Sequence, residues 1–283
     1  MNSKSFQPLK TLLLLLSLLV AGCASTDKDI PELPVEEYFS TARTALDAGN
    51  YGTAVEQYET LEAKYPFGPY AQQAGLDLIY AYYKFDDPLS TIAAANRFIK
   101  LHPRHTHVDY AYYMRGLANF DQGITSISRY LPVDPSERDA GAANQSFQDF
   151  SMLVQRFPES RYAPDARKRM IYLRDNLSKN EIHAARYYHK RGAFVAAVNR
   201  ADYVLHNFPG TSAVPDALTI LVESYMSIGR SDLAQDAYRV LLLNHPDRPE
   251  ITELRKKYQF PRSSSMNTTL DSGMSIQKPD TKS

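Results

Sequence analysis

Apolar residues recur at helical spacing along most of the chain, and the clearest example is the stretch 51–66, YGTAVEQYETLEAKYP. Its apolar positions lie three and four residues apart, which is the spacing of one face of an α-helix. Pro66 ends this helix, because the residue before a proline is pushed out of the helical region. Gly49 supplies a tight turn before it. No long alternating stretch indicates a sheet, so the pattern predicts an all-α protein.

The same order of glycine, small residue, aromatic residue and proline recurs, which marks an internal repeat. Five prolines that follow an aromatic residue or a histidine end predicted helices, at intervals of 37, 55, 51 and 37 residues. In the first unit Ala42 would pack against Ala54 beside Tyr58. This arrangement resembles the tetratricopeptide repeat, although the usual tryptophan is absent. The resemblance implies a right-handed superhelix of five tetratricopeptide-like helix pairs that bury their apolar faces by stacking, at about 35–66, 70–103, 108–158, 162–209 and 213–246.

Three local features lead to separate predictions. Asp86-Asp87-Pro88 is typical of a helix N-terminus, where carboxylates are favourable, so we interpret it as a cap and not as a catalytic pair. The first helix of the fourth repeat is unusually long, and we predict a break in it at residues 177–180. The irregular insertion 121–145 carries apolar residues, which favours a loop that is packed or covered by a partner.

The first 22 residues have the pattern of an export signal, with Lys4 and Lys10 before a short apolar run. The run is too short to span a bilayer. The ending Val20-Ala21-Gly22-Cys23 resembles the bacterial lipobox, which implies covalent lipid on Cys23 and no other cofactor. An ordinary secretory signal is the alternative. Because residue 24 is Ala and not Asp, similarity to sorted lipoproteins implies the periplasmic face of the outer membrane. We expect a tether over 23–34 and a disordered tail over 259–283.

Composition excludes several classes of function. The formal net charge is zero, so no overall basic field would attract nucleic acid. The single cysteine allows neither an internal disulfide nor a thiolate metal cluster. The charge is nevertheless uneven: nine acids and three bases over 24–66 give −6, and ten bases and four acids over 159–200 give +6. We predict a partner-docking surface near the fourth repeat, with the candidates Arg161, Arg167, Lys190, Arg191 and Arg200.

No motif argues for catalysis. His102, His105 and His107 could ligate zinc, but they lie in a link between two repeats and no carboxylate falls at ligand spacing. We therefore expect neither a metal site nor an enzyme. No glycine-rich phosphate loop, nucleophile elbow or His-Glu-x-x-His run is present.

Tyrosines crowd onto two of the predicted helices, in the stretches IYAYY at 79–83 and YAYYM at 110–114. At 3.6 residues per turn the tyrosines of one helix cannot all face the same side. If Tyr82 packs inside, Tyr80 and Tyr83 face the concave side, where tyrosines suit peptide binding. Core packing is the alternative. The candidate groove residues are Phe39, Arg43, Tyr80, Tyr83, Tyr113 and Leu117.

The lipobox, the five degenerate repeats and the insertion together resemble the BamD (ComL) family of outer-membrane protein assembly lipoproteins. The most specific stretches are LDLIYAYYK at 76–84, DYAYYMRGLANF at 109–120, and the run that contains Asp134, Ser136, Arg138 and Asp139. The resemblance implies a scaffold of the β-barrel assembly complex. Its partners would be the barrel component through its POTRA domains, other lipoproteins of that complex, and targeting strands of unfolded outer-membrane proteins. The alternative is another periplasmic repeat adaptor, for cell-wall synthesis or division.

Overall fold

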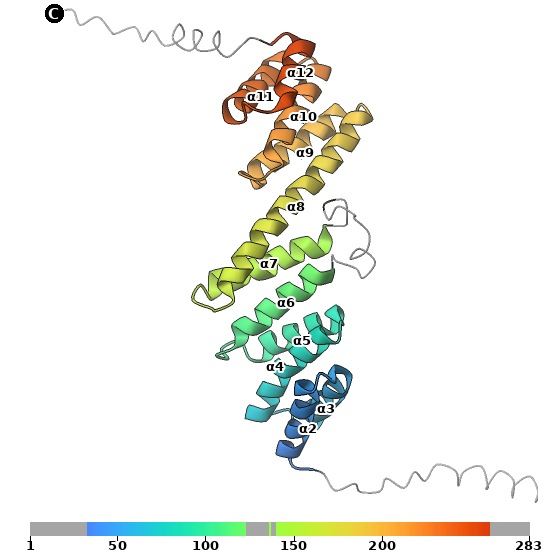
Figure 1. Ribbon diagram of the computed structural model, residues 1–283, viewed down its shortest axis with the longest axis vertical. Helices are drawn as coiled ribbons and strands as arrows, with labels where there is room; N and C mark the ends of the chain where they lie inside the picture. Colours follow the sequence, from blue (N-terminus) through green and yellow to red (C-terminus); the bar gives the residue numbers. More distant parts are fainter. Residues whose placement is uncertain (1–32, 123–135, 137–139, 261–283) are drawn as a thin grey trace, which may run out of the picture.

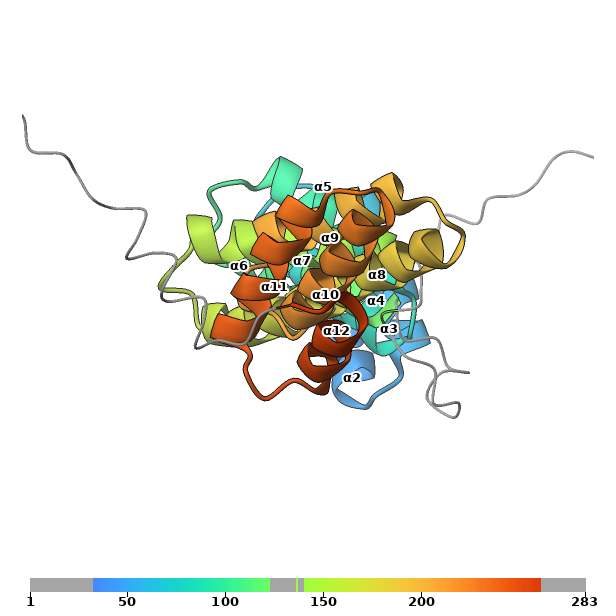
Figure 2. The same ribbon diagram turned by 90° about the horizontal axis from the view of Figure 1, so that it is seen from above.

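The computed structural model describes residues 33–122, 136 and 140–260. Within these residues the protein consists of helices α2–α12 and contains no strand. The helices stack pairwise into an elongated superhelix with α2 at one end and α12 at the other (Figure 1). Seen from above, the pairs wind around a common axis (Figure 2). The predicted all-α repeat architecture is therefore confirmed.

Each repeat contributes one A helix and one B helix. The A helices are α2 Val35–Asp47, α4 Pro69–Lys84, α6 Val108–Gln122, α8 Ala163–Lys190 and α10 Val214–Ser227. The B helices are α3 Tyr51–Lys64, α5 Pro88–Leu101, α7 Gly141–Arg156, α9 Phe194–Asn207 and α11 Ser231–Asn244. Successive A helices contact one another, α2 with α4, α4 with α6, and α8 with α10. The A helices therefore line the inner, concave side of the stack.

The turns and ends of the helices follow from the residues predicted to form them. Gly49, Gly192 and Gly229 have φ of 75–77° between an A and a B helix, a region that costs glycine nothing. In the second repeat Asp86 takes this conformation, with φ 62°. The carboxylate of Asp87 accepts a hydrogen bond from the amide of Ser90 at 3.0 Å, so the predicted cap is confirmed at Asp87 and Asp86 forms the turn.

Every B helix is followed by one C-cap residue that directly precedes a proline. These five residues all have φ between −138° and −126° and ψ between 45° and 71°, outside the helical region that a following proline disfavours. The residues expected to pack inside the first repeat, Ala42, Ala54 and Tyr58, are fully buried. Residues of the same kind in the later repeats are also fully buried: Ala185, Ala197, Val222, Ala234 and Tyr238.

The predicted break in the fourth A helix is wrong, because α8 is continuous over 28 residues. Its middle is stabilised by tertiary contacts that local sequence does not reveal. Leu177 and Ser178 are buried, and the carboxylate of Asp175 accepts a hydrogen bond from the amide of Ser212 at 2.9 Å. The side-chain amide of Asn180 donates to the carbonyl of Ser136 in the insertion, at 2.8 Å. The helix thereby connects a core formed with α7 to a second core formed with α9 and α10.

One helix was not predicted. Helix α12, Pro249–Tyr258, begins with proline in its first turn and carries three bases in its last turn, both typical of a short helix. Beyond it the ring of Phe260 stacks on Tyr238 at a centroid distance of 4.5 Å. The predicted signal peptide, lipidated Cys23 and most of the tether lie outside the described residues, as do most of the insertion and of the tail.

Candidate functional site: a tyrosine-lined pocket on the concave face

A pocket of about 580 Å³ lies on the inner face, where the A helices of the first three repeats meet the start of α8. Its walls carry one tyrosine from each of the first three repeats and one from the residue before α8. The lining residues are Arg43, Leu46, Asp47, Tyr51, Gln73, Leu76, Asp77, Tyr80, His107, Tyr110, Arg161 and Tyr162. Tyrosine offers a large apolar ring and a hydroxyl that can meet backbone groups, so such a surface suits an extended peptide.

The floor of the pocket is a polar network centred on Asp77. Its carboxylate accepts hydrogen bonds from the hydroxyl of Tyr58 at 3.0 Å, from the amide of Gln73 at 2.8 Å and from the guanidinium of Arg43 at 3.4 Å. Arg43 also binds Asp47, one turn further along α2. A hydrogen bond to Asp47 and the charge of Asp77 raise the pKa of Arg43. The network fixes the charges of the floor, because each acid there has a partner.

The far wall is built from stacked rings. Tyr113 and Tyr162 are stacked, with centroids 4.7 Å apart and an interplanar angle of 17°, and Tyr110 contacts Tyr162 in a tilted arrangement at a centroid distance of 5.7 Å. Burial raises the pKa of Tyr110. The hydroxyl of Tyr113 donates to Asp165 at 2.7 Å, and burial together with this bond raises the pKa of Tyr113 to about 12. These contacts fix the ring of Tyr162 and with it the orientation of the wall.

Only two of the six predicted groove residues line this pocket. Arg43 does so, and Tyr80 does so with 38% of its side chain exposed. Phe39 packs edge-on against Tyr58 and near Tyr70, behind the wall. The hydroxyl of Tyr83 donates to Asp121 at 2.7 Å, away from the pocket.

The prediction that Leu117 lines the groove is wrong, and Tyr113 supports the wall of the pocket without lining it. Leu117 is only 7% exposed and belongs to the core of the third repeat. It is 37 residues from Tyr80, which is the interval between Pro66 and Pro103, so the two have equivalent positions in their repeats. The stack twists, and equivalent positions of successive helices therefore do not face the same point. In α6 the pocket is lined by Tyr110, two turns before Leu117.

The five predicted docking residues do not form one surface. Arg161 and Arg167 lie at the start of α8, and Lys190 and Arg191 at its end. At 1.5 Å per residue the two ends of this helix are roughly 40 Å apart. Arg161 lines the tyrosine pocket, and Arg200 on α9 forms an ion pair with Glu181 at 2.9 Å. The prediction of one surface is corrected because α8 is continuous. The candidate bases at its two ends, counted together over 159–200, are therefore far apart in space.

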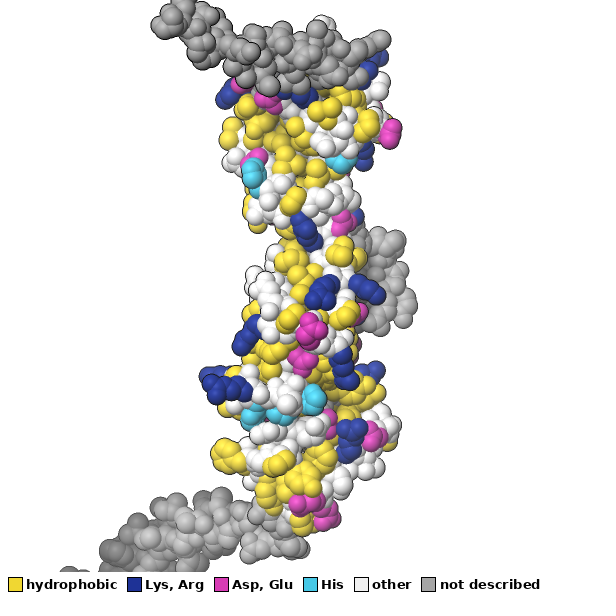
Figure 3. Space-filling view, turned by 90° about the vertical axis from the view of Figure 1, so that its left-hand side faces the viewer, with side chains coloured by type: hydrophobic (Ala, Val, Ile, Leu, Met, Phe, Trp, Pro, Cys, Tyr) yellow, Lys and Arg dark blue, Asp and Glu magenta, His cyan; other side chains and the backbone are white. Residues whose placement is uncertain are grey.

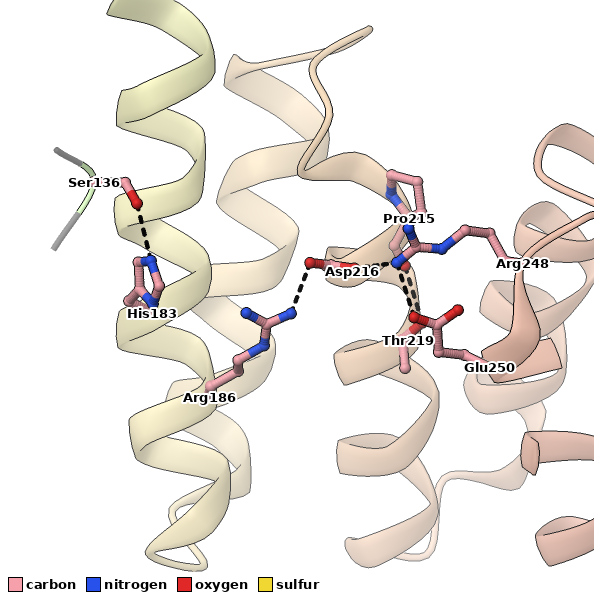
Figure 4. Close-up of polar contacts among 8 residues, drawn as sticks. All are labelled: Ser136, His183, Arg186, Pro215, Asp216, Thr219, Arg248 and Glu250. Atoms are coloured by element: carbon pink, nitrogen blue, oxygen red, sulfur yellow. Dashed lines mark hydrogen bonds and ion pairs between the residues drawn. The ribbon is translucent and has the colours of Figure 1, made fainter. Parts of the chain in front are cut away.

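A second polar cluster lies at the end of α8, where α10 and α12 meet it (Figure 4). The carboxylate of Asp216 binds Arg186 at 2.6 Å and Arg248 through its other oxygen, and Arg248 also binds Glu250 at 2.9 Å. Lys190 lines the adjoining pocket of about 220 Å³. Sequence reasoning missed this cluster, because Arg248 is the N-cap of the unpredicted helix α12 and Glu250 lies in its first turn.

The three histidines of the α5–α6 link pack onto an aromatic ring and onto one another. The ring of Phe98 lies 5.1 Å from His102 and 5.3 Å from His105, and His105 lies 5.7 Å from His107. Histidines gather on the lower half of the face shown in Figure 3, which holds the N-terminal repeats. Burial, together with the neighbouring histidines, lowers the pKa of His105. Across the described ranges no three His, Cys, Asp or Glu side chains form a group that could hold a metal ion.

The length and apolarity of a helix decide whether it can span a membrane. Among residues 33–122 and 140–260, none of the helices is both long enough and apolar enough to span a bilayer.

Stacked helix pairs with a concave pocket define this chain as a tetratricopeptide-type repeat protein. Comparison with known proteins gives the family: residues 31–240 match the YfiO model, described as "Outer membrane lipoprotein". The chain belongs to this family.

Its curated relatives carry the name outer membrane protein assembly factor BamD. The protein of Neisseria meningitidis serogroup A strain Z2491 is 42% identical over 243 residues, covering 84% of this chain and 91% of the relative. That of Vibrio cholerae El Tor Inaba N16961 is 39% identical, covering 82% and 96%. That of Xylella fastidiosa Temecula1 is 36% identical, covering 86% and 85%.

Proposed function

We propose that this protein is a lipid-anchored scaffold of the outer-membrane β-barrel assembly complex, facing the periplasm. The observation that carries the proposal is the pocket that presents Tyr51, Tyr80, Tyr110 and Tyr162 on one concave surface. The name shared by the relatives, assembly factor for outer membrane proteins, gives the class of process. The pocket would receive an extended segment of an unfolded outer-membrane protein, its tyrosines holding apolar side chains and the peptide backbone.

The C-terminal repeats would bind the periplasmic POTRA domains of the barrel component. The exposed bases Lys190, Arg191 and Arg200 support this proposed interaction. Arg191 lies over the ring of Tyr187 at 4.8 Å, a pairing of arginine with tyrosine that is frequent in protein interfaces. Other lipoproteins of the complex would bind along the stack. The proposed role is binding and positioning, without catalysis.

The anchor is proposed to be lipid on Cys23, and two acyl chains or more would hold the protein firmly at the membrane. Cys23→Ala should release the protein from the membrane fraction or leave it unprocessed, and unchanged membrane retention would remove the anchor from the proposal.

Co-purification after mild detergent extraction tests the scaffold role. We expect recovery of the barrel component, and Arg200→Glu should weaken it, because the new carboxylate would repel Glu181 and any acidic partner. Arg97→Glu, an exposed position on α5 whose arginine likewise pairs with a glutamate, Glu62, serves as a control of equal charge change in the N-terminal repeats. Recovery of peptidoglycan synthases without the barrel component would favour the adaptor alternative and contradict the proposal.

A further inference from the structure

The tyrosine pocket contains one cation without an anionic partner. Arg161 lies in the link before α8, and its side chain is exposed at the rim of the pocket. Within the described residues it forms no ion pair. Its guanidinium instead lies over the ring of Tyr162 at 4.8 Å and donates to the hydroxyl of that tyrosine at 2.6 Å. The sequence favoured Arg161 as part of a distant docking surface, and the structure places it in the pocket.

The acids around Arg161 are already bonded. On the floor, Asp77 accepts from Tyr58, Gln73 and Arg43, and Asp47 is paired with Arg43. The two carboxylates share one guanidinium, so the floor keeps a net negative charge, but in the described residues both are bonded within the network and neither forms an ion pair with Arg161. The N–H donors of Arg43 are occupied by these carboxylates, so a ligand would have to displace a carboxylate to bind Arg43.

The nearest remaining acid is Asp109, at the start of α6. One of its oxygens accepts from the amide of Tyr110 at 2.9 Å, and the other accepts from the hydroxyl of Ser160 at 2.6 Å. The hydrogen bond to Tyr162 raises the pKa of Arg161, and the charge of Asp109 contributes in the same direction. Both oxygens of Asp109 are nevertheless held by other donors. Among the described residues no carboxylate is therefore paired with the guanidinium of Arg161, which is open to an anion from outside.

Arg161 and His107 lie close to the starts of two helices. His107 lines the same pocket and directly precedes α6, and Arg161 precedes α8 by two residues. Tyr162 orients the guanidinium from below, so the arginine loses less conformational freedom when it binds a carboxylate.

We infer that Arg161, with His107 on the same rim, binds a carboxylate of the peptide that occupies the tyrosine pocket. This inference rests on the proposed function, and it adds a polar specificity element to a site whose walls are aromatic. The carboxylate could be the peptide's C-terminus or an acidic side chain, since both present the same pair of oxygens to a guanidinium. The rings of Tyr80 and Tyr110 would hold the residues that precede it.

The test is a binding titration with a fluorescent ten-residue peptide of alternating apolar residues that has one internal Asp and a free C-terminal carboxylate. Three further peptides carry a C-terminal amide, an internal Asn, or both changes. The proteins are the wild type, Arg161→Ala, Arg161→Lys and the control Arg167→Ala. Arg167 lies near the start of α8, is exposed, donates to the carbonyl of Pro158 and is not among the residues that line the pocket.

Arg161→Ala should weaken binding of the parent peptide about fivefold, which is the upper range of an exposed ion pair. Arg161→Lys should retain part of the affinity, and Arg167→Ala should bind as the wild type does. For one of the two singly neutralised peptides the effect of Arg161→Ala should vanish, and that peptide identifies which carboxylate is bound.

Equal binding of the parent peptide by the wild type and Arg161→Ala would overturn the inference and leave the proposed function standing. So would a loss that persists with the doubly neutralised peptide, since the arginine would then act through packing. Absence of binding of all four peptides by the wild type would contradict the proposed peptide site itself, and the inference with it. Circular dichroism of each variant checks that the fold is retained.

Discussion

The hydroxyl of Tyr58 donates a hydrogen bond of 3.0 Å to the carboxylate of Asp77, across the packing layer between the first and second repeats. Tyr58 is fully buried, and burial, with the charge of Asp77, raises its pKa. Tyr58 is also the tyrosine of the repeat pattern, and Asp77 forms the floor of the pocket. The same bond therefore joins the core of the stack to its candidate site.

Replacing Asp77 by Ala should destabilise the protein by roughly 2 kcal/mol, because the buried hydroxyl of Tyr58 then has no acceptor. Tyr58→Phe removes the donor and leaves the carboxylate its bonds to Gln73 and Arg43, so its cost should be about 1 kcal/mol. Urea denaturation measures both. Equal stability of Asp77→Ala and the wild type would show that the network adds nothing to the packing.

Tyr80 and Leu117 have equivalent positions in their repeats, and substitution should affect them in opposite ways. Tyr80→Ala should weaken peptide binding and leave stability within about 0.5 kcal/mol, because the side chain is at the surface. Leu117→Ala should cost about 2–4 kcal/mol, because it leaves a cavity in the core. Thermal denaturation and peptide titration separate the two effects, and a strongly destabilised Tyr80→Ala would mean that Tyr80 is core.

The ion pair between Arg115 and Asp149 lies inside the third repeat. Its atoms are 2.7 Å apart, Asp149 is 0% exposed, and the carboxylate also accepts from Asn119 at 2.8 Å. Asp149→Asn should destabilise by about 3 kcal/mol, because Arg115 remains buried without its counter-charge. The exposed pair of Asp236 with Arg239 provides the control, and Asp236→Asn should cost less than about 0.5 kcal/mol. Similar losses of stability in Asp149→Asn and Asp236→Asn would contradict the predicted difference between the buried and the exposed ion pair.

Asp165 should make stability depend on pH. Burial works in the opposite direction, but hydrogen bonds from Arg169 and Tyr113 lower the pKa of Asp165 below its ordinary value of 3.8. A lowered pKa in the folded state stabilises the protein above pH 4, and this contribution is lost as the pH falls through the folded value.

Asp165→Asn should therefore be less stable than the wild type at pH 7, by about 0.5 kcal/mol after solvent screening. The gap should narrow below pH 4. Denaturation curves of both proteins between pH 7 and pH 3 check this, and a gap that widens toward low pH would have the wrong sign.

The fold was largely predictable because its signals are local. Glycine turns, proline stops and the small residues of the packing layer each act within one helix pair, and the pairs repeat. The predicted break in α8 was wrong because contacts with residues distant in sequence determine the structure there. The middle of α8 is polar in sequence, yet Asn180 has its partner in the insertion at Ser136, 44 residues away.

The site was less predictable, because it depends on how the repeats twist against one another. Arg43 and Tyr80 were found from helical periodicity. Tyr110 and Tyr162 were not predicted to line the site. Their orientation depends on the contact between α6 and the start of α8, which periodicity within one helix does not reveal. Arg161 was found as a basic residue, but its place in the pocket required the structure.

The most direct test of the account is photocrosslinking in intact cells from a photoreactive residue at position 80, with position 56 on the exposed side of α3 as the control. The account predicts that position 80 crosslinks to unfolded outer-membrane proteins while position 56 does not. Equal crosslinking from both positions, or none from position 80 to outer-membrane proteins, would contradict it.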